Sequence, residues 1–157
     1  MRRIGFLVLP AVALAAGCTM KYRQPENSAS AKSEMVILAK AELLRSARAE
    51  LADDGFRIER FDEDAGTLHT EARAEQLQPG DADCGSYAGF DPVSDVRTQM
   101  ELRYVVTADE GRVAVQALMS GAFRPAIGAA PVPLVCVSRG ALEERMIARI
   151  IDRVLVS

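Results

Sequence analysis

Two segments of the chain place their apolar residues on one stripe of a helix. The first runs from about Ser33 to Asp54, contains neither Gly nor Pro, and is rich in strong helix formers. Gly55 follows it, and glycine commonly ends a helix because it adopts the left-handed conformation easily. We therefore predict an amphipathic helix with one buried face. The predicted buried stripe consists of Ile37, Ala41, Leu44, Ala47 and Leu51.

The second helical pattern begins near Gly140 and continues toward the C-terminus. Charged residues such as Glu143, Glu144 and Arg149 take the side opposite the apolar stripe. Acidic residues come early in this segment and basic residues late, an order that suits the helix dipole. The stripe consists of Leu142, Met146, Ile147, Ile150, Ile151 and Val154.

Between the two helices the chain alternates apolar and polar residues, which predicts β-strands grouped as two hairpins. Turn-forming residues with Asp, Glu and Gly separate the strands of each pair. Each strand is apolar on one face and mostly polar on the other, as in an antiparallel sheet that is covered on one side only. The hairpins comprise residues 56–61 with 67–73, around the turn 62–66, and residues 98–106 with 113–119, around the turn 109–111.

These elements predict an α+β fold for residues 33–157, which we expect to form a single α-β-β-β-β-α globular domain. Its expected architecture is a two-layer sandwich: a four-stranded antiparallel sheet with the N- and C-terminal helices packed on one face. If the hairpins form a meander, both tight turns lie at one end of the sheet. The long connections, residues 74–96 and 124–139, then lie at the other end.

The chain begins with a basic start, Met1-Arg2-Arg3, and an apolar run from Ile4 to Ala16. That run is shorter than the roughly 20 residues that a membrane-spanning helix needs, but it has the length of a secretory signal. At the end of this run, Ala15-Ala16-Gly17-Cys18 resembles the lipobox of bacterial lipoproteins, although Leu is more usual at the position of Ala15. The resemblance implies a signal peptide over residues 1–17 and lipidation of the Cys18 thiol. It says nothing about the rest of the chain.

Lipidation would place the protein on a membrane, with palmitate among the expected acyl chains. Thr19 follows the cysteine where Asp would mark retention at the inner membrane, so the pattern resembles that of outer-membrane lipoproteins. We therefore expect a lipid-anchored protein in the periplasm, on the periplasmic face of the cell outer membrane. Residues 18–32 are mostly polar and are predicted to form a lipidated tether.

Cys84 and Cys136 belong to the two long connections. Export places them in an oxidising compartment, where a lone pair of cysteines most simply forms a disulfide bond. Such a bond would join the two long loops and stabilise the fold by roughly 4 kcal/mol. Two free buried thiols remain an alternative. A metal site is a weaker one, because two distant cysteines and a single histidine lack the close pairs of zinc sites.

Composition limits the function classes. A chain of 157 residues with 49% apolar and 26% charged residues is typical of a globular protein. Its net charge of −3 provides no basic excess for binding nucleic acid.

The sequence contains no catalytic set, so we expect no enzyme, no cofactor and no metal. His69 lies on a predicted polar strand face without a nucleophile beside it, and we interpret it as solvated. The run Asp62-Glu63-Asp64 lacks the spacing of a calcium loop and is interpreted as a hairpin turn. Asp81 and Asp83 are interpreted as solvated loop carboxylates.

Two surfaces have both a structural and a functional interpretation. One is the charged face of the predicted sheet, which we interpret as solvated, with a polar partner surface as the alternative. This face carries Arg57, Glu59, Glu71, Arg73, Glu101 and Arg103. The other is the apolar segment from Arg124 to Val135, whose three prolines predict that it forms no edge strand. We expect it to fold over the open end of the core, with an exposed docking patch as the alternative.

The predicted element order resembles, in architecture alone, the small domains of envelope-assembly lipoproteins such as the accessory lipoproteins of the outer-membrane β-barrel assembly machinery. No residue role follows from that resemblance. We expect a non-enzymatic accessory or scaffold subunit that binds another envelope protein. The alternative is a domain that binds a lipid, glycan or other small ligand between sheet and helices.

Overall fold

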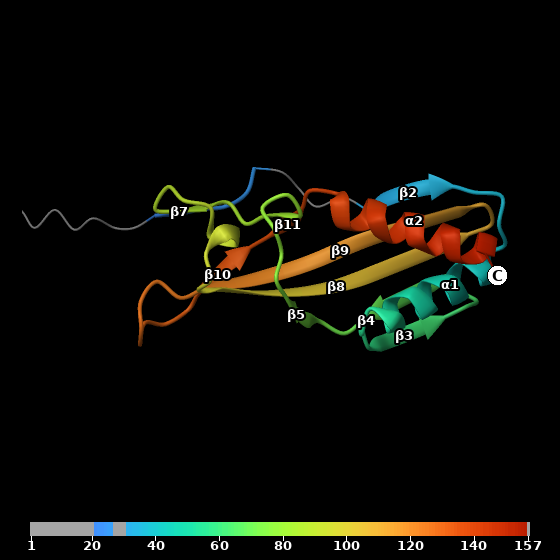
Figure 1. The fold of residues 1–157 in the computed structure, drawn as a ribbon, viewed down its shortest axis with the longest axis horizontal. Helices are drawn as coiled ribbons and strands as arrows, with labels where there is room; N and C mark the ends of the chain where they lie inside the picture. The colour runs from blue at the N-terminus through green and yellow to red at the C-terminus, as the bar shows by residue number, and fades with distance from the viewer. Residues whose placement is uncertain (1–20, 27–30, 157) are drawn as a thin grey trace, which may run out of the picture.

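The computed structural model describes residues 21–26 and 31–156, and a long β-hairpin forms its centre. The two strands of that hairpin, β8 (Thr98–Asp109) and β9 (Arg112–Phe123), pair along their whole length. They belong to a seven-stranded antiparallel sheet with the path β10-β9-β8-β4-β3 (Figure 1). Two further strands lie off this path, β2 beside β9 and β5 beside β8. The other strands of the sheet are β2 (Lys32–Met35), β3 (Ile58–Asp62), β4 (Thr67–Thr70), β5 (Arg73–Glu75) and β10 (Val132–Val135).

Two small sheets complete the strands that the structure describes. They involve the long connections and the N-terminal segment, and they lie toward the left of Figure 1. A short 3-10 helix, η1 (Pro92–Ser94), precedes β8. The small sheets pair β1 (Tyr22–Arg23) with β7 (Ser86–Tyr87), and β6 (Ala82–Asp83) with β11 (Val137–Ser138).

The helices α1 (Lys40–Asp53) and α2 (Ala141–Val156) run side by side in opposite directions over one face of the sheet (Figure 1). Every second residue of β8 from Met100 to Ala108 is buried beneath them, and most of the residues between are exposed. The helices contribute the apolar residues that face these strands. The core between the layers includes Leu43, Leu44, Ala47, Leu51, Leu102, Tyr104, Val106, Val113, Val115, Met146, Ile147 and Ile150.

The predictions of a four-stranded sheet and of an α-β-β-β-β-α order are wrong, because strands precede the first helix and three further strands join the sheet that contains the two hairpins. The first is β2, which occupies residues that helix propensity assigns to the N-terminal helix. That helix begins only at Lys40. Pairing with the edge of β9 satisfies backbone groups that would otherwise need solvent, and this outweighs a weak helix preference. Ile37, predicted on the buried stripe, is therefore fully exposed in the connection between β2 and α1.

The second unexpected strand is β10, which forms where prolines predict none. Pro133 lies opposite Ala122 in an edge strand. A proline is tolerated there because an edge strand needs ladder hydrogen bonds on one side only. The third is β5, which pairs with β8 after a break at residues 71 and 72.

Both tight turns lie at one end of the sheet and the long connections at the other, as the meander predicts. The turns touch each other, because the N–H of Ala108 donates to the carbonyl of Gly66 at 2.9 Å. Gly66 has a φ of +69°, and a Cβ there would lie 2.2 Å from the Ala108 carbonyl oxygen, so only glycine fits. We call the end with these turns the distal end, and the end with the long connections the stapled end.

A buried carboxylate closes a gap along the outer edge of β9. Strand β2 pairs with residues 112–115 of β9 and β10 pairs with residues 120–123. Between them, the N–H of Ala117 donates to Glu143 Oε1 at 3.1 Å, and the Ser138 hydroxyl donates to Glu143 Oε2 at 2.5 Å. Glu143 is completely buried, although the sequence pattern assigns it to the solvent side of α2. Its side chain takes the place of a β-strand partner.

Candidate docking site

Cys84 and Cys136, which the sequence predicts to be bonded, form a disulfide between two segments 52 residues apart. Both residues are buried. The bond joins the connection before β8 to the connection after β10 and so defines the stapled end. Cys18, the predicted lipidation residue, lies outside the described residues, as does the predicted signal peptide 1–17.

The N-terminal segment is held against this end by Tyr22. Its hydroxyl oxygen lies 3.1 Å from the carbonyl oxygens of both Cys84 and Val135, and it accepts from the N–H of Val135 at 2.9 Å. One hydroxyl proton serves either carbonyl. The pairing of β1 with β7 extends the attachment. Part of the segment that the sequence predicts as a tether is therefore in contact with the stapled end.

Two exposed apolar side chains mark the tips of the stapled end. Val96 precedes β8, and Ile127 lies in the connection between β9 and β10, which projects beyond the sheet in Figure 1. Arg97 links the two loops, because its Nη1 donates to the carbonyl of Pro125 at 2.9 Å. The apolar segment from Arg124 to Val135 thus divides into an exposed tip and an edge strand with Leu134 buried.

Asp95 fixes the position of Arg97. The carboxylate accepts from Arg97 Nε at 2.8 Å and from Nη2 at 2.6 Å. Hydrogen bonding from the Arg97 side chain, with a second bond from its backbone N–H, lowers the pKa of Asp95 to about 2. The guanidinium also lies over the ring of Phe123, 4.9 Å from its centroid. The loop tips are therefore held in place by specific contacts.

The distal end carries a second group of exposed apolar side chains. Met35 is the last residue of β2 and Ile37 follows that strand, and Leu155 and Val156 lie in the last turn of α2. Figure 1 places the C-terminus of α2 and the turn between β8 and β9 at this same end. Backbone hydrogen bonds hold the segment around Ile37 against that turn, from Val36 N–H to Gly111 O and from Gly111 N–H to Leu38 O.

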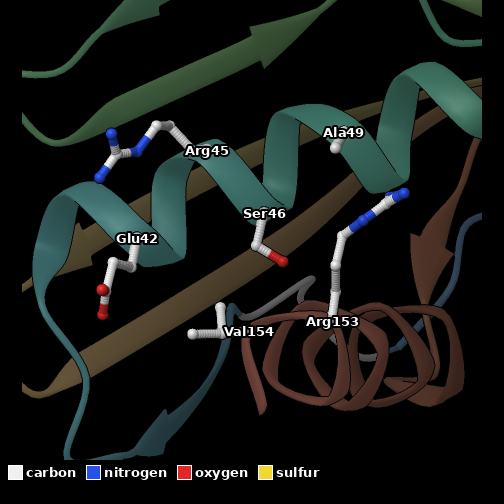
Figure 2. Close-up of a pocket in the computed structure, with 6 residues that line it drawn as sticks. All are labelled: Glu42, Arg45, Ser46, Ala49, Arg153 and Val154. Atoms are coloured by element: carbon white, nitrogen blue, oxygen red, sulfur yellow. The ribbon is translucent and has the colours of Figure 1, made fainter. Parts of the chain in front are cut away.

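A groove runs between the two helices and leads toward the distal end (Figure 2). It has a volume of about 420 Å³. Ser46 and Arg153 point across it toward the opposite helix, and the Ser46 hydroxyl donates to the Ile150 carbonyl at 2.7 Å. The groove is lined by Glu42, Arg45, Ser46, Ala49, Arg153 and Val154.

Ion pairs bridge the two helices along the rest of this seam. Arg149 lies 2.7 Å from Glu50 and 2.6 Å from Asp54, and Arg153 lies 2.9 Å from Glu50 and 2.6 Å from Asp53. Hydrogen bonding to Asp54 raises the pKa of Arg149 above its usual range. These charges connect the helices to each other, so we assign them a structural role.

The opening between sheet and helices is small. A cleft of about 250 Å³ lies beside Phe56, Tyr104 and Met146. Ligand sites usually have volumes of about 300–1,000 Å³, so this cleft is below the usual size. Burial raises the pKa of Tyr104 above its usual range, and the ring meets Phe56 edge to face at 5.2 Å. The interior here is a packed core.

The acidic residues considered as candidate ligands take part in loop and ion-pair contacts. Asp62 Oδ1 accepts from the N–H of Ala65 at 2.8 Å, and this bond lowers the pKa of Asp62. Asp81 pairs with Arg145 at 2.8 Å, and Asp83 lies 3.7 Å from Arg139. Within residues 21–26 and 31–156, no three His, Cys, Asp or Glu side chains form a group that could hold a metal ion.

His69 lies in β4, opposite Arg60 on one side and Val105 on the other, and is partly exposed. On the open sheet face, Arg57 and Glu71 form an exposed pair at 3.8 Å.

Arg73, predicted on that same face, has a different environment. It lies over the ring of Phe56 at 4.1 Å and hydrogen-bonds to the Asp54 carbonyl and the Glu75 carboxylate. The break before β5 changes the register, and a one-residue change exchanges the two faces of a strand.

Comparisons with known proteins leave the family open. No protein-family model matches the chain, and no curated protein matches it. Among solved structures, a DUF4468 family protein from Bacteroides ovatus aligns with a TM-score of 0.42 and 17% identity. The alignment covers 66% of this chain and 58% of that one, and a similarity at this level assigns neither fold nor function.

Proposed function

We propose that this chain is a lipid-anchored protein of the cell envelope, attached through Cys18, that serves as a non-enzymatic accessory or scaffold subunit. The leader that ends in Ala15-Ala16-Gly17-Cys18 supports the anchor. No helix in the described part of the chain has the length and apolar character needed to cross a bilayer. We assign the attachment to the lipid, on the periplasmic face of the outer membrane.

The observation that carries the proposal is the contact of Tyr22 with Cys84 and Val135. Cys18 precedes Tyr22 by four residues, and four extended residues span at most about 14 Å. The lipid attachment point is therefore close to the stapled end. The distal end then faces away from the membrane, where another protein can reach it.

We assign the distal end and the groove between α1 and α2 as the docking surface for a protein partner. Four exposed apolar side chains at that end and the adjoining groove suit an amphipathic segment with apolar anchors and charged flanks. Ala49 lines the groove with a small side chain, and the methylene chains of Arg45 and Arg153 add apolar surface beside their charges.

Membrane attachment is tested with Cys18→Ser. The variant should appear in the soluble fraction of the envelope, while the parent chain stays with membranes. Unchanged membrane association of the variant would contradict the lipid anchor.

Docking is tested with photocrosslinking residues placed separately at Ile37 and Leu155 in intact cells. We expect both positions to crosslink to the same polypeptide. Copurification of that polypeptide should be lost with Leu155→Asp and retained with Ile127→Asp, since position 127 lies at the stapled end. Equal loss with both variants, or different products from the two positions, would contradict docking at the distal end.

A further inference from the structure

The side chains of Val96 and Ile127 are exposed on loops that are firmly held. Arg97 hydrogen-bonds to the carbonyl of Pro125 and to the carboxylate of Asp95, and the N–H of Arg124 donates to the Arg97 carbonyl at 3.3 Å. A mobile loop could fold an apolar side chain back against the protein. These contacts keep both side chains pointing outward, so an exposed apolar tip is a fixed feature of the stapled end.

The N-terminal segment determines what this tip meets. Tyr22 bonds to Val135, the last residue of β10, and β10 follows directly from the loop that carries Ile127. With lipid at Cys18, the about 14 Å reach from Tyr22 keeps the stapled end next to the bilayer. The surface that the tip meets first is therefore the lipid itself.

Charge agrees with this orientation. The stapled end carries exposed Lys21, Arg23 and Arg124, while its acidic residues take part in local hydrogen bonds (Asp91 and Asp95) or ion pairs (Asp81 and Asp83). Within the described residues 21–26 of the N-terminal segment, Glu26 is the one acidic residue, and it is exposed. The turns of the distal end are more acidic, with Asp62, Glu63, Asp64, Asp109 and Glu110 against Lys40 and Arg112. Anionic lipid therefore attracts the exposed basic residues beside the lipid attachment point and repels the distal end.

We propose that the stapled end rests on the membrane, with the side chains of Val96 and Ile127 in the headgroup layer. This inference rests on the proposed lipid anchor at Cys18. The lipid supplies the attachment, because acyl chains bury far more apolar surface than two side chains do. The tip supplies the orientation, by stopping the protein from lying on its open sheet face or on its helices.

The test compares two isoleucines at opposite ends. Ile127 and Ile37 have exposed fractions of 105% and 104%, so replacing either with cysteine does not disturb the core. Each variant, Ile127→Cys or Ile37→Cys, is made as the full lipidated chain and labelled with an environment-sensitive fluorophore. The labelled chains are reconstituted into vesicles of phosphatidylethanolamine and phosphatidylglycerol, with and without a lipid that carries a quencher near the headgroup. Cofloatation with the vesicles is measured in the same samples.

Both chains should float with the vesicles. The label at 127 should be quenched at least severalfold more strongly than the label at 37, because it lies about 5–10 Å into the headgroup region. Adding Val96→Asp should reduce the quenching at 127 without reducing floatation. Floatation without quenching at 127, or equal quenching at both positions, would overturn the proposed orientation and leave the anchor intact. A chain that does not float would overturn the anchor and the orientation together.

Discussion

The two ends of the molecule expose similar apolar side chains but hold them in different ways. At the stapled end a disulfide, the Tyr22 hydroxyl and the Arg97 guanidinium join segments that are distant in sequence. At the distal end, backbone hydrogen bonds with Gly111 in the turn between β8 and β9 hold the segment that carries Ile37, and the last turn of α2 carries the other exposed residues. Exposure alone therefore does not distinguish two surfaces. The contacts behind them and the charges around them do.

Removing the disulfide should have the largest effect on the difference in stability between the two ends. The double variant Cys84→Ala with Cys136→Ala should lower the free energy of unfolding by about 4 kcal/mol, because the unfolded chain is no longer constrained. Denaturant unfolding measures this. Hydrogen exchange should show the loss of protection at the stapled end, with α1 and α2 little changed. Equal loss of protection at both ends would show that the ends are not held independently.

The second-largest loss of stability is expected from replacing Glu143, the buried carboxylate between the two ends. Glu143→Ala leaves the N–H of Ala117 and the hydroxyl of Ser138 without their acceptor, and it should lower the free energy of unfolding by about 3 kcal/mol. Glu144→Ala is the matched control. Glu144 is exposed and lies 3.1 Å from Lys32 Nζ, so its replacement should cost less than about 1 kcal/mol. Similar unfolding curves for the two variants would refute the assigned role of Glu143.

Tyr22→Phe tests the attachment of the N-terminal segment. It removes one hydroxyl and its hydrogen bonds, and we expect a loss of about 1 kcal/mol. The more specific result is faster proteolytic cleavage after Arg23, since β1 should separate from β7 more often. Cleavage at the distal end, for example after Arg112, should keep its rate. If the Arg23 site stays as resistant as in the parent chain, the hydroxyl is not what holds the segment.

The smallest effect concerns the pH dependence of the stapled end. The folded-state pKa of Asp95 is about 2, below the ordinary value of 3.8, so its ion pair with Arg97 stabilises the folded protein above pH 4. That contribution is lost as the pH falls from about 4 to about 2. A carboxyl titration followed by NMR should give a midpoint near 2 for Asp95. In an Arg97→Gln variant the midpoint should return toward 3.8, and an unchanged midpoint would remove Arg97 as the cause.

Local periodicity was sufficient for the elements whose stability is local. The alternation of residues 98–106 and 113–119 and the stripe of α2 correspond to the central hairpin and the second helix. Local periodicity gave wrong predictions where tertiary contacts determine the secondary structure or the burial of a residue. Residues 32–35 pair with an edge of β9 that no local pattern reveals, and Glu143 faces inward because that same edge has a gap.

For the stapled end, the disulfide could be predicted because two cysteines remain besides Cys18 and the meander brings the two long connections that carry them to one end of the sheet. Tyr22 could not. Its partners lie 62 and 113 residues away, and a lone tyrosine in a polar segment gives no periodic signal. Ile37 shows the converse case, since its spacing fits a buried stripe but the helix starts only after it. A candidate surface can therefore be located only from the tertiary structure.

The divided edge of β9 has a consequence for self-association. An unpaired strand of twelve residues would offer a long template for strand exchange between copies and for fibril growth. Here two strands of four residues and one carboxylate cover that edge in turn. Lys32 and Glu34 place charges on one short strand. Pro133 removes an amide from the other, and Tyr22 occupies its last amide. A neighbouring copy therefore meets no continuous ladder on this side, which would suit the proposed attachment to a two-dimensional surface.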